Sequence, residues 1–143
     1  MKIDREQVYN KYNGLCAYCG NPIEIKSMQV DHIFPQARKH RLKSNVMREI
    51  ENIEFTDIDD IRNLNPSCRR CNHYKRALDV SEFRKLLLSL HERIQKQYID
   101  KVAIDYGIIT VKPFDGIFYF EKERETLIAF RGPINNMTEK WVK

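Results

Sequence analysis

Apolar residues in the first third of the chain recur in short stretches with helical or strand spacing. Residues 4–12 predict a short helix, because Val8 and Tyr12 lie four positions apart on one face and a glycine follows. Beyond it, apolar residues are dense and mixed with polar ones, which predicts two short strands, one around residues 21–22 and one over residues 28–32. A proline at position 35 ends the second strand.

The middle of the chain carries helical signals. Residues 69–76 contain no helix breaker and predict a short helix. Asp79 then fits an N-cap, with Glu82 completing a capping box, so a second helix should begin there. Its apolar positions follow the helical period and form a stripe that is most simply a packing surface: Phe83, Leu86, Leu87, Leu90 and Ile94.

Strand spacing returns near the C-terminus. Residues 108–111 and 117–120 are rich in β-branched and aromatic residues and flank a Pro-Phe-Asp-Gly turn, which predicts a hairpin. A third strand over residues 127–130 would complete a small antiparallel sheet. The pattern therefore predicts an α+β protein in two parts, residues 1–78 and a C-terminal extension, 79–143, of a helix and a small sheet.

Composition narrows the class of protein. The chain has 143 residues, 25 Lys and Arg against 20 Asp and Glu, and a pI near 9.0, which suits one soluble domain with an appendage and leans toward a polyanionic partner. Apolar runs are too short to span a membrane. The first five residues are partly charged, unlike a signal peptide, so we expect a cytoplasmic protein in a bacterium or phage-infected cell.

Charge is unevenly placed within residues 36–62. The segment begins basic and turns acidic, which usually means a solvated surface. The functional alternative is that the basic half contacts backbone phosphates while the acidic half faces away.

The four cysteines form two Cys-x-x-Cys pairs. They are Cys16, Cys19, Cys68 and Cys71. Two such pairs can close a tetrahedral thiolate site around a structural Zn²⁺. The alternatives are a thioredoxin-like redox pair and two ordinary disulfides, which the expected reducing compartment disfavours.

Between and beside these pairs lie an Asp-His step at Asp31 and His32, an Asn-Leu step at Asn63, and Asn72 followed by Lys75. In this order and spacing, residues 14–76 resemble the HNH endonuclease family. The resemblance implies a ββα-metal nuclease core, braced by a Cys₄ zinc site and carrying one catalytic divalent ion.

The resemblance also implies roles for individual residues. Asp31 matches the metal-binding acid, His32 the general base, Asn63 the residue that holds the base, and Asn72 the second metal ligand. An asparagine thus stands where the second histidine of the family name would be. His73, one position further on, points in a different direction on a helix and is not assigned to the metal.

The chemistry of these side chains agrees with those roles. Asp31 and Asn72 both offer oxygen, which suits Mg²⁺ or Mn²⁺, and an imidazole such as that of His32 can take up a proton near neutral pH. Asp31 and His32 are neighbours, so on a regular strand they would point to opposite faces.

Each assignment also has a structural alternative. Asp31 and His32 can be an ordinary strand end, and Asn63 and Asn65 can belong to a Pro-containing turn, the structural role that we assign to Asn65. The basic residues that follow can contact phosphates or merely solubilise a helix, and the position of Lys75 beside the proposed metal favours phosphate contact for it: Arg69, Arg70, Lys75 and Arg76.

These observations predict a metal-dependent endonuclease that hydrolyses DNA and leaves 5′-phosphate and 3′-hydroxyl ends, as the resemblance implies. The alternative is a non-catalytic, zinc-dependent nucleic-acid-binding module, and an RNA substrate is a weaker possibility. The sequence does not choose between a monomer, which should nick, and a homodimer, which can cut both strands.

Overall fold

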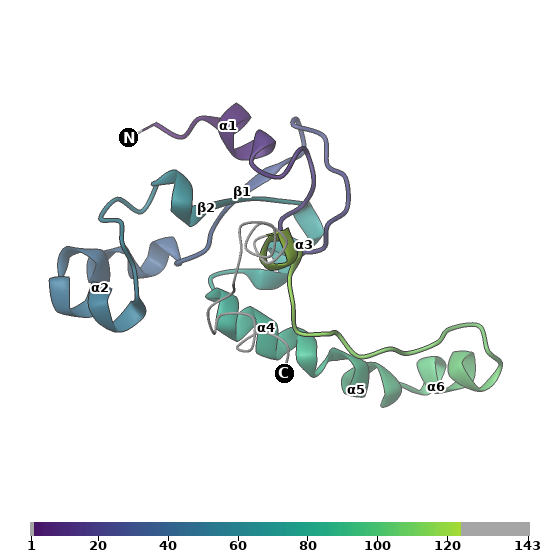
Figure 1. Cartoon of the computed structure of the whole chain (residues 1–143). Helices are drawn as coiled ribbons and strands as arrows, with labels where there is room; N and C mark the ends of the chain where they lie inside the picture. Colours follow the sequence, from purple (N-terminus) through teal and green to yellow (C-terminus); the bar gives the residue numbers. More distant parts are fainter. Residues whose placement is uncertain (1, 124–143) are drawn as a thin grey trace, which may run out of the picture. The chain divides into compact units, whose positions relative to one another are not determined.

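The computed structural model describes residues 2–123 and combines short helices with one two-stranded antiparallel sheet (Figure 1). This mixed class of helix and sheet agrees with the sequence. In chain order the elements are α1 (Arg5–Asn10), β1 (Gln29–His32), the 3₁₀ helix η1 (Gln36–Lys43), α2 (Asn45–Glu51), the 3₁₀ helix η2 (Ile61–Asn63), β2 (Leu64–Ser67), α3 (Arg69–Lys75), α4 (Val80–Leu88), α5 (Leu90–Gln95) and α6 (Tyr98–Asp105).

The chain divides into two compact units. The first contains Met1–Val80 together with Phe118–Phe120, and the second contains Ser81–Ile117 and the residues from Glu121 onward. We call them unit 1 and unit 2. Within residues 2–123, no helix is long and apolar enough to cross a bilayer.

The sheet of unit 1 pairs β1 with β2, and α3 follows β2 and packs against β1. Asp31 lies opposite Asn65, and His32 lies opposite Leu64. The strand predicted over residues 28–32 is therefore present, but its partner is not the segment around residues 21–22, which makes only an isolated bridge between Leu15 and Pro22.

The Pro-containing segment beside Asn63, predicted as a turn, instead forms β2. Pro66 is compatible with a strand here because the sheet has only two strands, so each strand leaves one edge where a missing N–H breaks no ladder. The carbonyl of Pro66 still accepts a hydrogen bond from the N–H of Ala17, at 2.9 Å. This bond fastens the first cysteine pair to β2.

A small apolar core holds α1 on the sheet. Val8 from α1 is buried against Met28 and Leu64. The Asp4 side chain caps α1 by accepting hydrogen bonds from the N–H groups of Glu6 and Gln7, which fixes where the helix begins. The helix predicted over residues 4–12 is thus confirmed in a shorter form.

The hairpin that the sequence predicted over residues 108–120 does not form in the part of the chain that the structure describes. Residues 108–118 have no regular secondary structure, and residues 119–123 are helical. Ile109, Val111 and Phe114 line one cavity of about 310 Å³ together with Leu87 and Leu90 from the helices. Packing against helices therefore replaces strand pairing, and the hairpin prediction was wrong. The third predicted strand, at residues 127–130, lies outside the described residues.

Candidate functional site

The first cysteine pair sits in a tight loop between α1 and β1. The N–H of Cys16 donates to the carbonyl of Asn21 at 2.8 Å, and the N–H of Gly20 donates to the carbonyl of Cys16 at 2.9 Å. Gly20 has a φ of 77°, a left-handed conformation that glycine adopts without strain. These bonds turn the loop so that both thiols approach the start of α3.

The second pair is placed by that helix. Cys68 is the N-cap of α3, and its sulfur accepts the N–H of Cys71 at 3.4 Å. The N–H of Cys68 in turn donates to the sulfur of Cys16 at 3.4 Å. The sulfur that caps α3 is thus also one that could ligate a metal, since backbone N–H groups stabilise sulfur that carries negative charge.

The four sulfur atoms fit a zinc ion. All lie within 4.8 Å of one another, and those of Cys19 and Cys68 are 3.9 Å apart. A tetrahedral ion with Zn–S bonds of about 2.3 Å would separate its ligands by about 3.8 Å. The four thiols are free, and the 3.9 Å separation is far longer than an S–S bond of about 2.05 Å. A closed Cys₄ metal site is compatible with this geometry.

The thiols are electrostatically unequal before any metal binds. The pKa of Cys16 is lowered to about 4, chiefly because the thiol of Cys71 donates a hydrogen bond to its sulfur. That same bond raises the pKa of Cys71, and burial is the main reason that the pKa of Cys19 is raised to about 11. One thiolate is therefore stabilised, whereas collecting further thiolates beside it requires a cation.

A separate cleft of about 220 Å³ lies at the end of β1. Residues from β1, from the segment that enters η1, and from α3 and its C-terminal end form its wall: Val30, Asp31, His32, Pro35, Gln36, Ala37, Asn72, Arg76 and Ala77. The structure thus brings Asp31, His32 and Asn72 to one cavity, although Asn72 is forty residues further along the chain. Asn63 is not part of the wall.

Asp31 is buried and already engaged by two side chains. The ammonium of Lys75 donates to both carboxylate oxygens, at 3.2 and 3.1 Å, and the hydroxyl of Tyr18 donates to Oδ2. Burial raises the pKa of Asp31, and Lys75 and Tyr18 oppose that shift. Burial also raises the pKa of Tyr18, so Tyr18 keeps its proton and remains a donor.

Lys75 lies inside unit 1, although the sequence had placed it in contact with phosphate. Its side chain is 1% exposed, and its ammonium also donates to the carbonyl of His32 at 3.1 Å. A lysine with three acceptors in the interior cannot reach a backbone phosphate without leaving them. Of the basic residues predicted from the sequence, the exposed ones are Arg69, Arg70 and Arg76.

His32 contacts an acid that the sequence did not single out. Its Nε2 lies 2.8 Å from Oδ1 of Asp59, and both side chains are mostly buried. Asp59 belongs to the acidic run that was interpreted as a solvated surface. Nothing in the spacing of that run distinguishes it from its neighbours, so only the folded loop reveals the contact.

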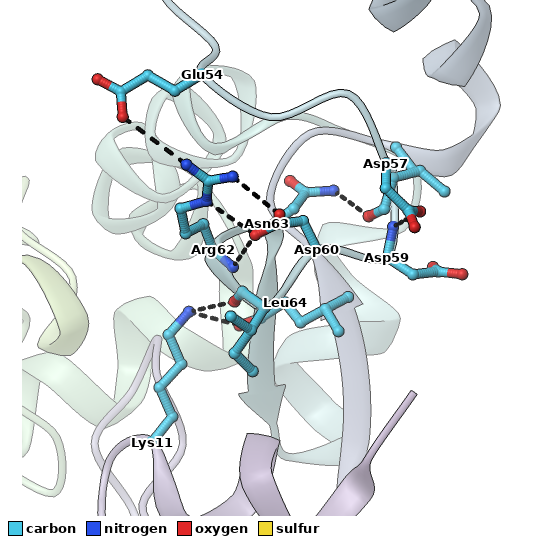
Figure 2. A network of polar contacts seen from close by, with 10 residues as sticks. Lys11, Glu54, Asp57, Asp59, Asp60, Arg62, Asn63 and Leu64 are labelled. Carbon is cyan, nitrogen blue, oxygen red and sulfur yellow. Dashed lines mark hydrogen bonds and ion pairs between the residues drawn. The ribbon is translucent and has the colours of Figure 1, made fainter. Parts of the chain in front are cut away.

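Asn63 holds the backbone beside His32 rather than its ring. Its Oδ1 accepts the N–H of Phe34 at 2.7 Å, and its Nδ2 donates to the carbonyls of Phe34 and Ile58, at 3.2 and 2.8 Å. The carbonyl of Asn63 also accepts the N–H of Ile33 at 2.8 Å. Figure 2 shows this amide directed toward the loop that carries Asp57 and Asp59. Asn63 thereby fastens the end of β1 to that loop.

The remaining predicted residues lie along α3. Asn72 is half-buried and lines the cleft, and within residues 2–123 no hydrogen bond engages its side-chain amide. His73 is exposed and does not line the cleft. Arg76 ends the helix with φ 53° and ψ −132°, a sparsely populated backbone conformation of the kind that clusters at functional sites.

Comparisons of the chain with protein-family models, with curated proteins and with solved structures each gave no match. What the chain can do must therefore be inferred from its own residues.

Proposed function

We propose that this protein is a metal-dependent endonuclease that hydrolyses DNA phosphodiester bonds with His32 as the general base. The observation that carries the proposal is the shared cleft of Asp31, His32 and Asn72. An imidazole and two oxygen-bearing side chains in one cavity are the groups that phosphodiester hydrolysis requires, because a base must deprotonate water and a cation must stabilise the departing oxygen.

The arrangement of elements supports the same proposal. Two antiparallel strands followed by a helix that packs on the first strand are elements that a ββα core would need, which supports the proposal. The Cys₄ cluster joins the loop before β1 to the start of α3, the helix that carries Asn72. A structural zinc there would fix Asn72 relative to Asp31 and His32 and would leave no ligand position for substrate.

Asp31 and Asn72 would hold the catalytic Mg²⁺ or Mn²⁺, which would offset the negative charge that develops on the phosphate and the leaving oxygen. His32 would take the proton of the attacking water. Asp31 must exchange its contacts with Lys75 for contacts with the ion, because the ammonium now neutralises the same carboxylate. Lys75 therefore keeps Asp31 in place before the ion binds.

Exposed basic residues would position the DNA. Arg76 lines the cleft and is exposed, so its guanidinium is suited to hold the phosphate beside the one that is cut. Arg69 and Arg70 lie on α3 and can bind neighbouring phosphates. These contacts carry no base information, so cleavage through them alone would be independent of sequence.

One observation favours the second candidate, a non-catalytic zinc-dependent nucleic-acid-binding module. Lys75 and Tyr18 engage the carboxylate of Asp31, as they would if Asp31 had only a structural role. Among the described residues no hydrogen bond engages the side-chain amide of Asn72, which lines the same cleft, and this favours the enzyme because its oxygen is available to a metal ion.

A plasmid-nicking assay separates the two candidates. We expect the wild-type protein to nick supercoiled DNA with Mg²⁺ or Mn²⁺ and not with EDTA, and we expect His32→Ala to abolish nicking while zinc content and DNA affinity stay unchanged. His73→Ala is the matched control, since it removes an exposed imidazole from the same unit. Equal inactivity of wild type and His32→Ala in every metal would leave the binding module.

A further inference from the structure

We propose that Asp59 is the positioning residue for His32, and that it holds the imidazole with hydrogen on Nε2 and the lone pair on Nδ1. The inference rests on the proposed function, in which His32 takes a proton from water. It adds a residue to the site that neither the sequence pattern nor the resemblance assigns. It also identifies Nδ1 as the nitrogen of His32 that accepts the proton.

The contact is short and sheltered. His32 Nε2 and Asp59 Oδ1 are 2.8 Å apart, and the two side chains are 14% and 23% exposed. A carboxylate can only accept hydrogen bonds, so the hydrogen of this pair belongs to Nε2. A neutral imidazole carries one hydrogen, which leaves Nδ1 as the nitrogen able to accept a proton.

Asp59 is held in place independently of His32. Its N–H donates to Oδ1 of Asp57 at 2.9 Å, and the preceding carbonyl, that of Ile58, accepts from Asn63 at 2.8 Å. Figure 2 shows the carboxylate of Asp59 directed away from the network around Arg62, whereas Asp60 pairs with Arg62. The loop is therefore fixed by other residues, and the Asp59 carboxylate remains available to His32.

This arrangement gives Asn63 and Asp59 connected roles. Asn63 fastens the backbone after His32 to the carbonyl next to Asp59, and Asp59 then fixes the ring. Without Asp59, the imidazole would exchange hydrogen between its two nitrogens and would rotate more freely. Partners of this kind typically change activity by about 10- to 100-fold when they are removed.

The position of the hydrogen can be measured without any cleavage. Long-range ¹H–¹⁵N correlation spectra of the full zinc-loaded chain, at mildly alkaline pH, assign each histidine tautomer. We expect His32 to carry hydrogen on Nε2 in the wild type and to become a mixture of tautomers in Asp59→Ala, while His40 and His73 stay unchanged. A His32 with hydrogen on Nδ1, or a spectrum indifferent to Asp59→Ala, would overturn the inference.

Cleavage kinetics supply the second readout. Asp59→Ala should lower kcat by about 10- to 100-fold with KM and zinc content unchanged. Asp59→Asn should lose at least as much, because its amide can donate to Nε2 and stabilise the wrong tautomer. Glu54→Gln is the matched control: it removes the same charge from the same loop, but its side chain is 88% exposed and its ion pair, with Arg62, is long at 4.0 Å.

The outcomes separate the inference from the proposed function. If the wild type cleaves and Asp59→Ala cleaves as fast as Glu54→Gln, the inference fails and the nuclease proposal stands. If the wild type is inert in every metal, the nuclease proposal fails, and the tautomer spectra still decide whether Asp59 holds the His32 ring.

Discussion

Replacing Lys75 with methionine tests how much the buried ion pair contributes to unit 1. Methionine fills most of the volume of the lysine stem but leaves the carboxylate of Asp31, which is 5% exposed, without its cation. Removing one partner of a buried pair typically costs about 3–5 kcal/mol, because a charge then stays buried without compensation. We expect Lys75→Met to lower the free energy of unfolding by that amount, measured by urea denaturation of the zinc-loaded protein with circular dichroism.

Two further variants test whether this loss of stability comes from the unpaired buried charge of Asp31 and not from the removal of any lysine. The double variant Asp31→Asn/Lys75→Met removes both charges and keeps an oxygen that can accept from Tyr18, so it should recover most of the loss. Lys122→Met breaks an ion pair with Asp115 whose two side chains are each 52% exposed, and it should cost less than about 1 kcal/mol.

The pH dependence of the same variant has a definite sign. Burial already raises the pKa of Asp31, and loss of the ammonium raises it further. When the pKa of an acid is higher in the folded state than in the unfolded state, its ionisation destabilises the folded state. The loss of unfolding free energy in Lys75→Met is therefore greatest above the raised pKa of Asp31, and it shrinks as the pH falls through that pKa. A Lys75→Met protein as stable as the wild type, or a double variant no better than the single one, would refute the reasoning.

Three other predictions concern the metal centre and the hydrogen bonds by which Asn63 fastens the end of β1 to the Asp59 loop. Cys68→Ser should lose zinc and unfold unit 1, because Cys68 is both a proposed ligand and the N-cap of α3; zinc analysis and circular dichroism test this, and a folded, zinc-loaded variant would contradict it. Zinc affinity, measured by competition with a colorimetric chelator, should fall on acidification, because protons compete for Cys19, whose pKa is raised to about 11, and for Cys71, whose pKa is also raised; affinity unaffected by pH would contradict the proposal. Asn63→Ala should cost about 2–4 kcal/mol in thermal or urea unfolding, since it leaves a buried N–H, a buried carbonyl and a partly buried carbonyl without their partner, and a neutral effect would contradict the role of Asn63 in fastening β1 to the Asp59 loop.

The sequence predicted those helices, strands and loops correctly that depend on a single local signal. The helix at α1 followed from the spacing of Val8 and Tyr12, the helix at α3 from the absence of a breaker, and the strand at β1 from dense apolar residues mixed with polar ones. The Cys-x-x-Cys spacing likewise predicted that each short loop presents its two thiols together. These local features depend on a few neighbouring residues. The meeting of the two pairs depends on the fold as well, because Cys19 and Cys68 lie 49 positions apart.

Predictions failed where distant packing decided the outcome. Pro66 indicated a turn, yet it lies in β2 because a two-stranded sheet leaves an edge that needs no N–H. The segment of residues 108–118 has strand composition, but it has no regular secondary structure, and Ile109, Val111 and Phe114 line a cavity with residues of α4 and α5. Composition indicates that such residues are buried, but it does not indicate whether they pack against a strand or against helices.

Two residues of the cleft region were misjudged because of their residue type. Lysine is almost always exposed, so Lys75 was expected on the surface, and only the fold shows that it compensates Asp31. Asp59 sits in a run of acids that resembles a solvated loop, and its contact with His32, 27 positions earlier, requires the chain to return to the end of β1. Ion pairs between distant segments leave no periodic trace in a sequence.

The central claim is that Asp31, His32 and Asn72 serve one divalent ion, and anomalous diffraction from zinc-loaded crystals soaked in Mn²⁺ tests it most directly. The account predicts a manganese peak in the cleft, with oxygens of Asp31 and Asn72 as ligands, with Lys75 withdrawn from Asp31, and with His32 still paired to Asp59. A cleft without manganese at saturating concentration, or an ion bound elsewhere while Lys75 keeps both oxygens of Asp31, would contradict it.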